Sequence, residues 1–155
     1  MSTAHQFWHL TMHECPVKIA RLDPGSAVPQ WARSGHPLTS VTWNAKETSV
    51  IAAADEVPIG VVQAGPFHAF EIEGPLDFTL TGVLGGLLAP LAREGIAVIT
   101  LSTFETDWIL IPVDQSDQAA TVWRYNGHTV DTDPQVRTAP PNDVLLEHPD
   151  VEGEV

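Results

Sequence analysis

The feature that most constrains the fold is a set of apolar residues that recur at three- and four-residue spacing. The set consists of Leu80, Val83, Leu84, Leu87, Leu88 and Leu91. This spacing predicts an amphipathic helix over residues 76–94, with Asp77 as its N-cap and Gly95 just after its end. Pro90 is expected to bend or strain the last turn of this helix.

The segments around this helix predict strands and a second helix. Apolar and polar residues alternate over residues 68–73, which is typical of a half-buried strand. After the first helix we expect two strands, a helix and a short final strand, over residues 96–103, 108–113, 115–126 and 128–130. The resulting order, βαββαβ, is that of the α+β ferredoxin-like fold, an antiparallel sheet backed by two helices.

The first half of the chain looks like a degenerate copy of the same unit. Residues 7–22 predict a bent strand or hairpin that Pro16 interrupts, and residues 38–43 and 48–53 predict a hairpin. A short helix is expected over residues 27–33, with Ser26 as its N-cap. We therefore expect two tandem modules, a degenerate one over residues 1–64 and a complete one over residues 65–131. The acidic, proline-containing segment 132–155 is expected to be a mobile tail.

Charge and cysteine content narrow the classes of function. The chain has 155 residues and a formal net charge of −13, from 20 acidic and 7 basic residues. This charge argues against sequence-independent binding to nucleic acid or to an anionic membrane surface. Cys15 is the single cysteine, which excludes an internal disulfide framework and favours a reducing compartment, so we expect a cytoplasmic protein. Neither a secretory leader nor a membrane span is expected.

The start of the predicted helix and the following hairpin carry groups that suit a zwitterion. Unpaired N–H groups at the helix start offer a seat for a carboxylate, and Gly74 would let the backbone come close. Asp77 or Asp107 would accept hydrogen bonds from an ammonium group. Each residue also has a structural interpretation: Asp77 as an N-cap and Asp107 as a turn residue. Three glycines are expected to permit close helix packing instead of ligand contact: Gly82, Gly85 and Gly86.

Three short motifs resemble the tandem ACT-domain family, whose best-known members include the CASTOR-type cytosolic arginine sensors. The motifs are GPLDF at residues 74–78, APLA at 89–92 and LSTFETDWIL at 101–110. The resemblance implies a regulatory module that binds a free amino acid at the seam between two ACT units, without fixing which one. The site residues that it implies are Gly74, Pro75, Leu76, Asp77, Phe78 and Thr79 from the loop, and Ser102, Thr103, Thr106 and Asp107 from the strand edge.

Other functions remain open at this stage. An ACT-like oligomerisation protein without a small ligand would be favoured if Phe78 or Phe104 filled the seam. A homo-oligomer is expected in either case, because one and a half modules leave an open sheet edge. No acid–base pair, phosphate loop or metal motif indicates an enzyme, and no cofactor is expected. His9, His13 and Cys15 share a strand face that suggests zinc, but solvent-facing histidines are favoured because no second cluster completes a site.

Overall fold

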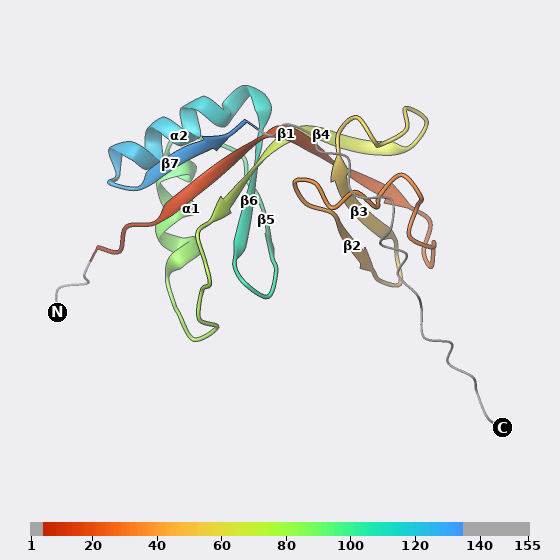
Figure 1. The fold of residues 1–155 in the computed structure, drawn as a ribbon, viewed down its shortest axis with the longest axis horizontal. Helices are drawn as coiled ribbons and strands as arrows, with labels where there is room; N and C mark the ends of the chain where they lie inside the picture. The colour runs from red at the N-terminus through yellow and green to blue at the C-terminus, as the bar shows by residue number, and fades with distance from the viewer. Residues whose placement is uncertain (1–4, 135–155) are drawn as a thin grey trace.

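The computed structural model describes residues 5–134, which form one sheet with two α-helices on one of its faces (Figure 1). The elements in chain order are β1 (His9–Leu22), β2 (Ser40–Trp43), β3 (Thr48–Ala53), β4 (Val62–Ile72), α1 (Val83–Arg93), β5 (Ile99–Ser102), β6 (Asp107–Pro112), a 3-10 turn η1 (Val113–Gln115), α2 (Ser116–Tyr125) and β7 (Thr129–Asp133). The strands are hydrogen-bonded in the order β2-β3-β1-β4-β6-β5, and β7 pairs with β1.

Two long strands, β1 and β4, run through the whole molecule and connect its helical part to the β2–β3 hairpin (Figure 1). They pair antiparallel along most of their length, with shifts in register between His13 and Val17 and between Val17 and Ile19. Pro16 lies within the first of these gaps, where its missing N–H removes no ladder hydrogen bond. The expected interruption at Pro16 is therefore confirmed, and residues 9–22 form a single bent strand.

The helical part has the expected element order along the chain, β4-α1-β5-β6-α2-β7. Its sheet contains one additional strand. The N-terminal half of β1 lies between β4 and β7, antiparallel to β4 and parallel to β7. Beneath α1 and α2 this sheet buries a core that includes Leu10, Phe70, Leu87, Ile109 and Trp123. An antiparallel-type sheet backed by helices on one face fits the expected α+β ferredoxin-like fold.

The β2–β3 hairpin is confirmed, and it forms an arm at the other end of β1. Leu38 and Ile51 of this arm pack with Trp108 and Leu110 on the face of the sheet that the helices leave open. The outer face of the arm buries a third cluster around Val50 and Ala52. A second core thus forms where the arm folds back over the sheet.

The helix expected over residues 27–33 is wrong: this segment contains turns only. Pro29 disfavours the α conformation at Val28, the residue before it, so a helix cannot easily start there. The hydroxyl of Ser26 donates to the Asp23 carbonyl at 2.7 Å instead of capping a helix. Trp43 then donates its indole N–H to the Ser26 carbonyl at 2.7 Å, so this loop is tied to β2.

The helix α1 begins later than its apolar spacing predicts. It starts at Val83, after Gly82 in the left-handed region at φ 78°, and Leu80 lies outside it. Its end is as expected, because Gly95 at φ 69° donates to the Ala92 carbonyl and stops the helix. Pro90 is accommodated inside the helix and is buried against the core.

Two further expectations concern the acidic tail and membrane-spanning helices. β7 ends at Asp133, so most of the tail expected over residues 132–155 lies outside the described residues. Within residues 5–134, no helix is long and apolar enough to cross a membrane.

Candidate functional site

A pocket of about 330 Å³ lies between the loop that enters α1 and the tip of the β5–β6 hairpin. Both segments extend beyond the sheet in the same direction (Figure 1). We call it the loop–hairpin pocket, and its lining comes from residues 76–85 and 102–107. Its volume is at the lower end of the range for small-molecule sites, which suits a ligand of amino-acid size.

The loop is fixed to the hairpin by backbone contacts. The Leu76 N–H donates to the Glu105 carbonyl at 2.8 Å. A Cβ at Gly74 would stand only 2.8 Å from that same carbonyl oxygen, so the position requires glycine for this close approach. Gly74 therefore serves the contact between loop and hairpin, in place of the expected approach to a ligand.

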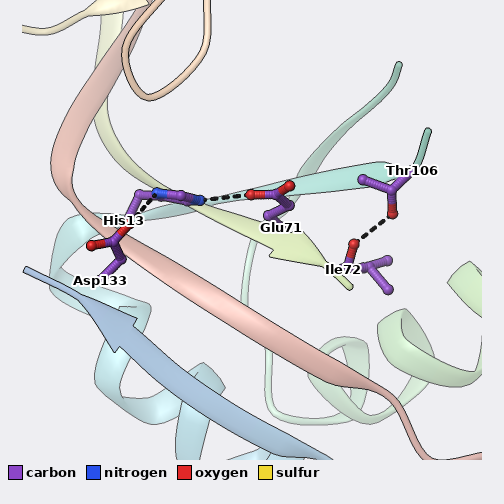
Figure 2. Close-up of polar contacts among 5 residues, drawn as sticks. All are labelled: His13, Glu71, Ile72, Thr106 and Asp133. Atoms are coloured by element: carbon purple, nitrogen blue, oxygen red, sulfur yellow. Dashed lines mark hydrogen bonds and ion pairs between the residues drawn. The ribbon is translucent and has the colours of Figure 1, made fainter. Parts of the chain in front are cut away.

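The hairpin tip is closed by its own threonines and serine. Thr103 donates its backbone N–H to the Thr106 carbonyl at 2.9 Å. The buried Thr106 hydroxyl donates to the carbonyl of Ile72 at 2.6 Å, which joins the tip to the end of β4 (Figure 2). Ser102 donates its hydroxyl to the Asp107 carboxylate across the last pair of the hairpin. This leaves the second carboxylate oxygen of Asp107 for other donors.

Asp77 does not cap the helix, which corrects the expectation from sequence. Its Oδ1 accepts hydrogen bonds from the Thr79 N–H at 2.7 Å and from the Thr79 hydroxyl at 2.6 Å. These two bonds, the hydroxyl first, hold the pKa of this exposed carboxyl below its usual value. Asp77 is six residues before the first helical residue, so it forms a local Asx turn at the mouth of the pocket.

The start of α1 forms one wall of the pocket. Gly82, Val83, Leu84 and Gly85 all line it. The N–H groups of the first turn have no partner within the helix, since the first intrahelical bond runs from Gly86 to the Gly82 carbonyl. A Cβ at Gly82, Gly85 or Gly86 would meet no atom within 4 Å, so the expectation that these glycines allow close helix packing is wrong.

Two exposed phenylalanines form part of the pocket wall. Phe78 from the loop and Phe104 from the hairpin tip meet edge to face, with ring centroids 5.2 Å apart. Their side chains remain 76% and 78% exposed, so most of both rings faces solvent. Large exposed aromatic rings beside a pocket are typical of a surface that a ligand or another chain covers.

The chemistry of the pocket suits a ligand with a positive group at one end and a negative group at the other. It contains two carboxylates, Asp77 and Asp107, and no lysine, arginine or histidine among the residues that the structure describes. The unpaired N–H groups at the start of α1 are its donors for a negative group. The pocket thus offers a zwitterion both acceptors and donors.

The structure brings together seven of the ten residues expected at the site. Those lining the pocket are Leu76, Asp77, Phe78, Ser102, Thr103, Thr106 and Asp107. Gly74 and Pro75 line a shallower neighbouring depression, and Thr79 is engaged by Asp77. Sequence reasoning did not assign five of the lining residues to the site: Leu80, Gly82, Val83, Leu84 and Gly85. It considered Phe104 only as a residue that could fill the seam. A later helix start would have indicated Leu80 and Gly82.

A second polar cluster lies on the face of the sheet that carries no helix. His13 is buried, and its Nε2 contacts the Glu71 carboxylate at 3.0 Å, while Nδ1 lies 3.7 Å from Asp133 (Figure 2). Its ring stacks on Trp108 with centroids 5.2 Å apart. The expectation of a solvent-facing edge histidine is therefore wrong for His13, which lies on a central strand.

The histidines of β1 pair with acids of β7. The His9 Nε2 lies 3.1 Å from the Asp131 carboxylate, and His13 contacts Asp133 in the same way further along the two strands. Within residues 5–134 no three histidine, cysteine or acidic side chains are arranged to hold a metal ion. The zinc arrangement considered for His9, His13 and Cys15 has no support from this geometry.

The comparisons with known families identify one domain. Residues 66–122 match the family model of the ACT domain. ACT domains are generally regulatory ligand-binding domains. The match covers α1, β5, β6 and most of β4 and α2, and it includes every residue that lines the loop–hairpin pocket. No curated protein sequence matches the chain.

Solved structures share the fold of most of the chain. A protein from Agobacterium tumefaciens, solved by a structural genomics consortium, is 26% identical, with a TM-score of 0.78 over 87% of this chain and all of the other. A Vibrio cholerae protein of unknown function, described as a possible transport protein, is 11% identical over 77% of this chain and 89% of its own, with a TM-score of 0.64. Aspartate kinase from Synechocystis is 15% identical with a TM-score of 0.58, over 91% of this chain and 30% of the kinase. The last two likenesses concern the fold alone.

Proposed function

We propose that this chain is a non-catalytic regulatory protein that binds a free amino acid in the loop–hairpin pocket. The observation that supports it most is the convergence of two separate sequence segments, 76–79 and 102–107, on one pocket inside the region that matches the ACT domain. The α-carboxylate would lie at the N–H groups of Val83 to Gly85, and the ammonium group at Asp107.

We propose further that a second copy of the chain closes the pocket. The exposed ring pair of Phe78 and Phe104 offers apolar surface at its wall, and a homo-oligomer would place the ligand between two ACT units. Ligand binding would then favour one association state over another, which is how a sensor acts on a protein partner. In this proposal residues 1–64 are a degenerate unit, residues 65–131 hold the ligand, and residues 132–155 are an acidic tail of a cytoplasmic protein.

A panel of the common amino acids tests ligand binding directly. An amino acid present at about 100 times its dissociation constant should stabilise the fold by roughly 2.7 kcal/mol, which a thermal-shift measurement detects. Gly85→Leu should abolish the shift, because Gly85 lines the pocket and has open space at its Cβ position. Gly86→Leu is the matched control, since the next glycine of the same helix does not line this pocket. A panel without any shift would contradict the proposal.

The role of the carboxylate can be tested without disturbing the hairpin. In Asp107→Asn the side-chain oxygen still accepts from Ser102, but the negative charge that faces an ammonium group is gone. We expect the affinity for the amino acid to fall by about tenfold or more, measured by titration calorimetry. Unchanged affinity would remove Asp107 from the site.

The second candidate function, an oligomerisation protein without a small ligand, is favoured by the same exposed ring pair. The double variant Phe78→Ser and Phe104→Ser should shift the wild-type oligomer to monomer in sedimentation analysis, whereas Tyr125→Ser, another exposed aromatic, should not. An oligomer that depends on these rings together with a flat amino-acid panel would favour this candidate over the sensor. A wild-type monomer at micromolar concentration would contradict both proposals of self-association.

A further inference from the structure

A second pocket, of about 490 Å³, also lies against α1 and shares Gly82 with the loop–hairpin pocket. Its floor is a face of α1 made of small residues, among them Gly82, Gly86 and Ala89. The N-terminal segment that includes His5 and Trp8 forms one wall, and residues 126–128 after α2 form another. We call it the α1 groove.

The walls of the α1 groove are fixed in place by contacts of the backbone and of Phe7. The Thr129 N–H donates to the Trp8 carbonyl at 3.0 Å. The Phe7 ring packs against Gly127, where a Cβ would collide with the ring. Segment 5–8 is therefore held beside the end of α2, and the groove is a built feature of the fold.

In the part of the chain that the structure describes, the α1 groove is lined by basic residues and by no acid, although the whole sequence has 20 acidic residues. Its basic side chains are His5, Arg93 and His128. The Arg93 guanidinium has no hydrogen-bond or ion-pair partner among residues 5–134, although Arg124 and Arg33 each donate to a carbonyl. A groove with an unpaired guanidinium in so acidic a protein favours a negatively charged occupant.

His128 adds a directed donor to the groove. The Trp8 backbone N–H donates to its Nδ1 at 3.0 Å, so Nδ1 is an acceptor and the neutral ring carries its proton on Nε2. Burial, and secondarily the charge of nearby His5, lowers the pKa of His128, which keeps this ring neutral at pH 7. Within the described residues Nε2 has no hydrogen-bond partner, so its N–H is available to a ligand.

We propose that the α1 groove binds a small organic anion that carries a carboxylate or phosphate group. Arg93 would bind the anionic group through its planar fork of donors, the Nε2–H of His128 would donate a further hydrogen bond, and Trp8 would supply an apolar wall. The volume of the groove is within the usual range for small-molecule sites. The groups proposed to bind the anion do not line the loop–hairpin pocket, so this site does not depend on amino-acid binding there.

Two adjacent glycines allow the two sites to be tested independently. Gly85 lines the loop–hairpin pocket and Gly86 lines the α1 groove, and a Cβ at either position meets no atom within 4 Å. Gly86→Leu should fill the groove without straining the helix, because neither glycine has a positive φ. Gly85→Leu is then the matched control for the groove, in the reverse of its role in the amino-acid test.

The experiment titrates the full chain with citrate and, separately, with inorganic phosphate, and follows the Trp8 and His128 resonances by NMR. We expect saturable shifts with at least one probe. Arg93→Gln should weaken binding by about tenfold or more, because a hydrogen bond to a charged group contributes at least that factor. Gly86→Leu should abolish binding, whereas Gly85→Leu should leave it within about twofold of wild type.

The possible outcomes either identify the class of ligand or contradict the proposal. Binding of phosphate alone identifies a phosphate site, and binding of citrate alone identifies a carboxylate site. No saturable shift with either probe at tens of millimolar, or binding that survives both Arg93→Gln and Gly86→Leu, would overturn the proposal. Because neither probe is an amino acid, a negative result here leaves the amino-acid panel unaffected, and the reverse also holds.

Discussion

The two faces of the sheet are stabilised in different ways. The face under α1 and α2 is closed by large apolar side chains, with the Trp123 ring set edge to face against Phe70 at 5.0 Å. Within residues 5–134 the opposite face carries no helix. There His13 lies between two carboxylates and stacks on Trp108, beside an apolar cluster covered by the arm. The same strands thus carry an apolar core on one side and a mixed apolar and polar one on the other.

This difference shows what the bend in β1 and β4 contributes. Without the arm, Trp108 and Leu110 would lie on an open face, because the fold places both of its helices on the other side. The arm covers them with Leu38 and Ile51, and His13 stacks on Trp108 at the border of this cluster. Apolar burial is the larger stabilising term per residue, so the two faces should respond unequally to mutation.

The largest effect is expected on the helix-covered face. Trp123→Ala removes a fully buried ring and leaves the Leu87 carbonyl without the indole N–H that it accepts from at 2.9 Å. We expect a loss of about 3–5 kcal/mol in the free energy of unfolding, measured by urea denaturation. Tyr125→Ala, on the same helix but 92% exposed, should change it by less than about 0.5 kcal/mol. Similar losses for the two variants would contradict the assignment of this core.

A smaller effect is expected on the helix-free face. His13→Leu keeps a side chain of similar bulk but removes the contacts to Glu71 and Asp133, whose half-exposed carboxylates can be solvated again. We expect a loss of about 1–2 kcal/mol by urea denaturation. His9→Leu, which removes a more exposed pair, should cost less than about 1 kcal/mol. A loss as large as that of Trp123→Ala would show that the faces contribute equally.

A third variant probes the join between β4 and the hairpin tip, which belongs to neither core. Thr106→Val removes the hydroxyl that donates to the Ile72 carbonyl at 2.6 Å and preserves the side-chain shape. One net hydrogen bond is lost, so we expect about 1 kcal/mol. Hydrogen exchange of the β5–β6 amides should become faster, since the tip opens more easily. Unchanged exchange would mean that the bond does not hold the tip.

The smallest effect is expected from pH. Burial lowers the pKa of His68 below 6.5, and burial together with His5 lowers that of His128. The unfolded chain therefore binds more protons than the folded one as the pH falls through about 6.5, so this contribution is full above that value and is lost below it. Denaturation midpoints measured from pH 7.5 to pH 5.5 should decrease, and less steeply in His68→Gln. A midpoint that rises toward pH 5.5 would contradict these shifts.

Much of the element order followed from the sequence, because it depends on local periodicity. Leu87 and Leu91 face the core as their spacing indicates, and Gly95 and Gly127 end the two helices. The start of α1 was misjudged because Leu80 continues the apolar spacing, although Gly82 adopts a conformation outside the helix. Asp77 was predicted as an N-cap because aspartate is common at that position. Its carboxylate instead accepts hydrogen bonds from the nearby Thr79, which compete with capping.

The sequence predicted the two segments of the candidate site but not how they meet. The sequence indicated residues 74–79 and 102–107, but not the contact between Gly74 and the Glu105 carbonyl that brings them together. The α1 groove gave no signal, since Arg93 and His128 come from separate elements that meet only in the folded chain.

The sequence by itself determined the order and type of most helices and strands, because a period of two or of 3.6 residues decides which side of an element is apolar. Only the tertiary structure decided that β1 lies between β4 and β7, which buries His13 beside Trp108. Which strands pair depends on contacts between residues distant in sequence. The free energy of those contacts cannot be read from a local sequence pattern. For the same reason, the two pockets that α1 lines were visible only after the chain had folded.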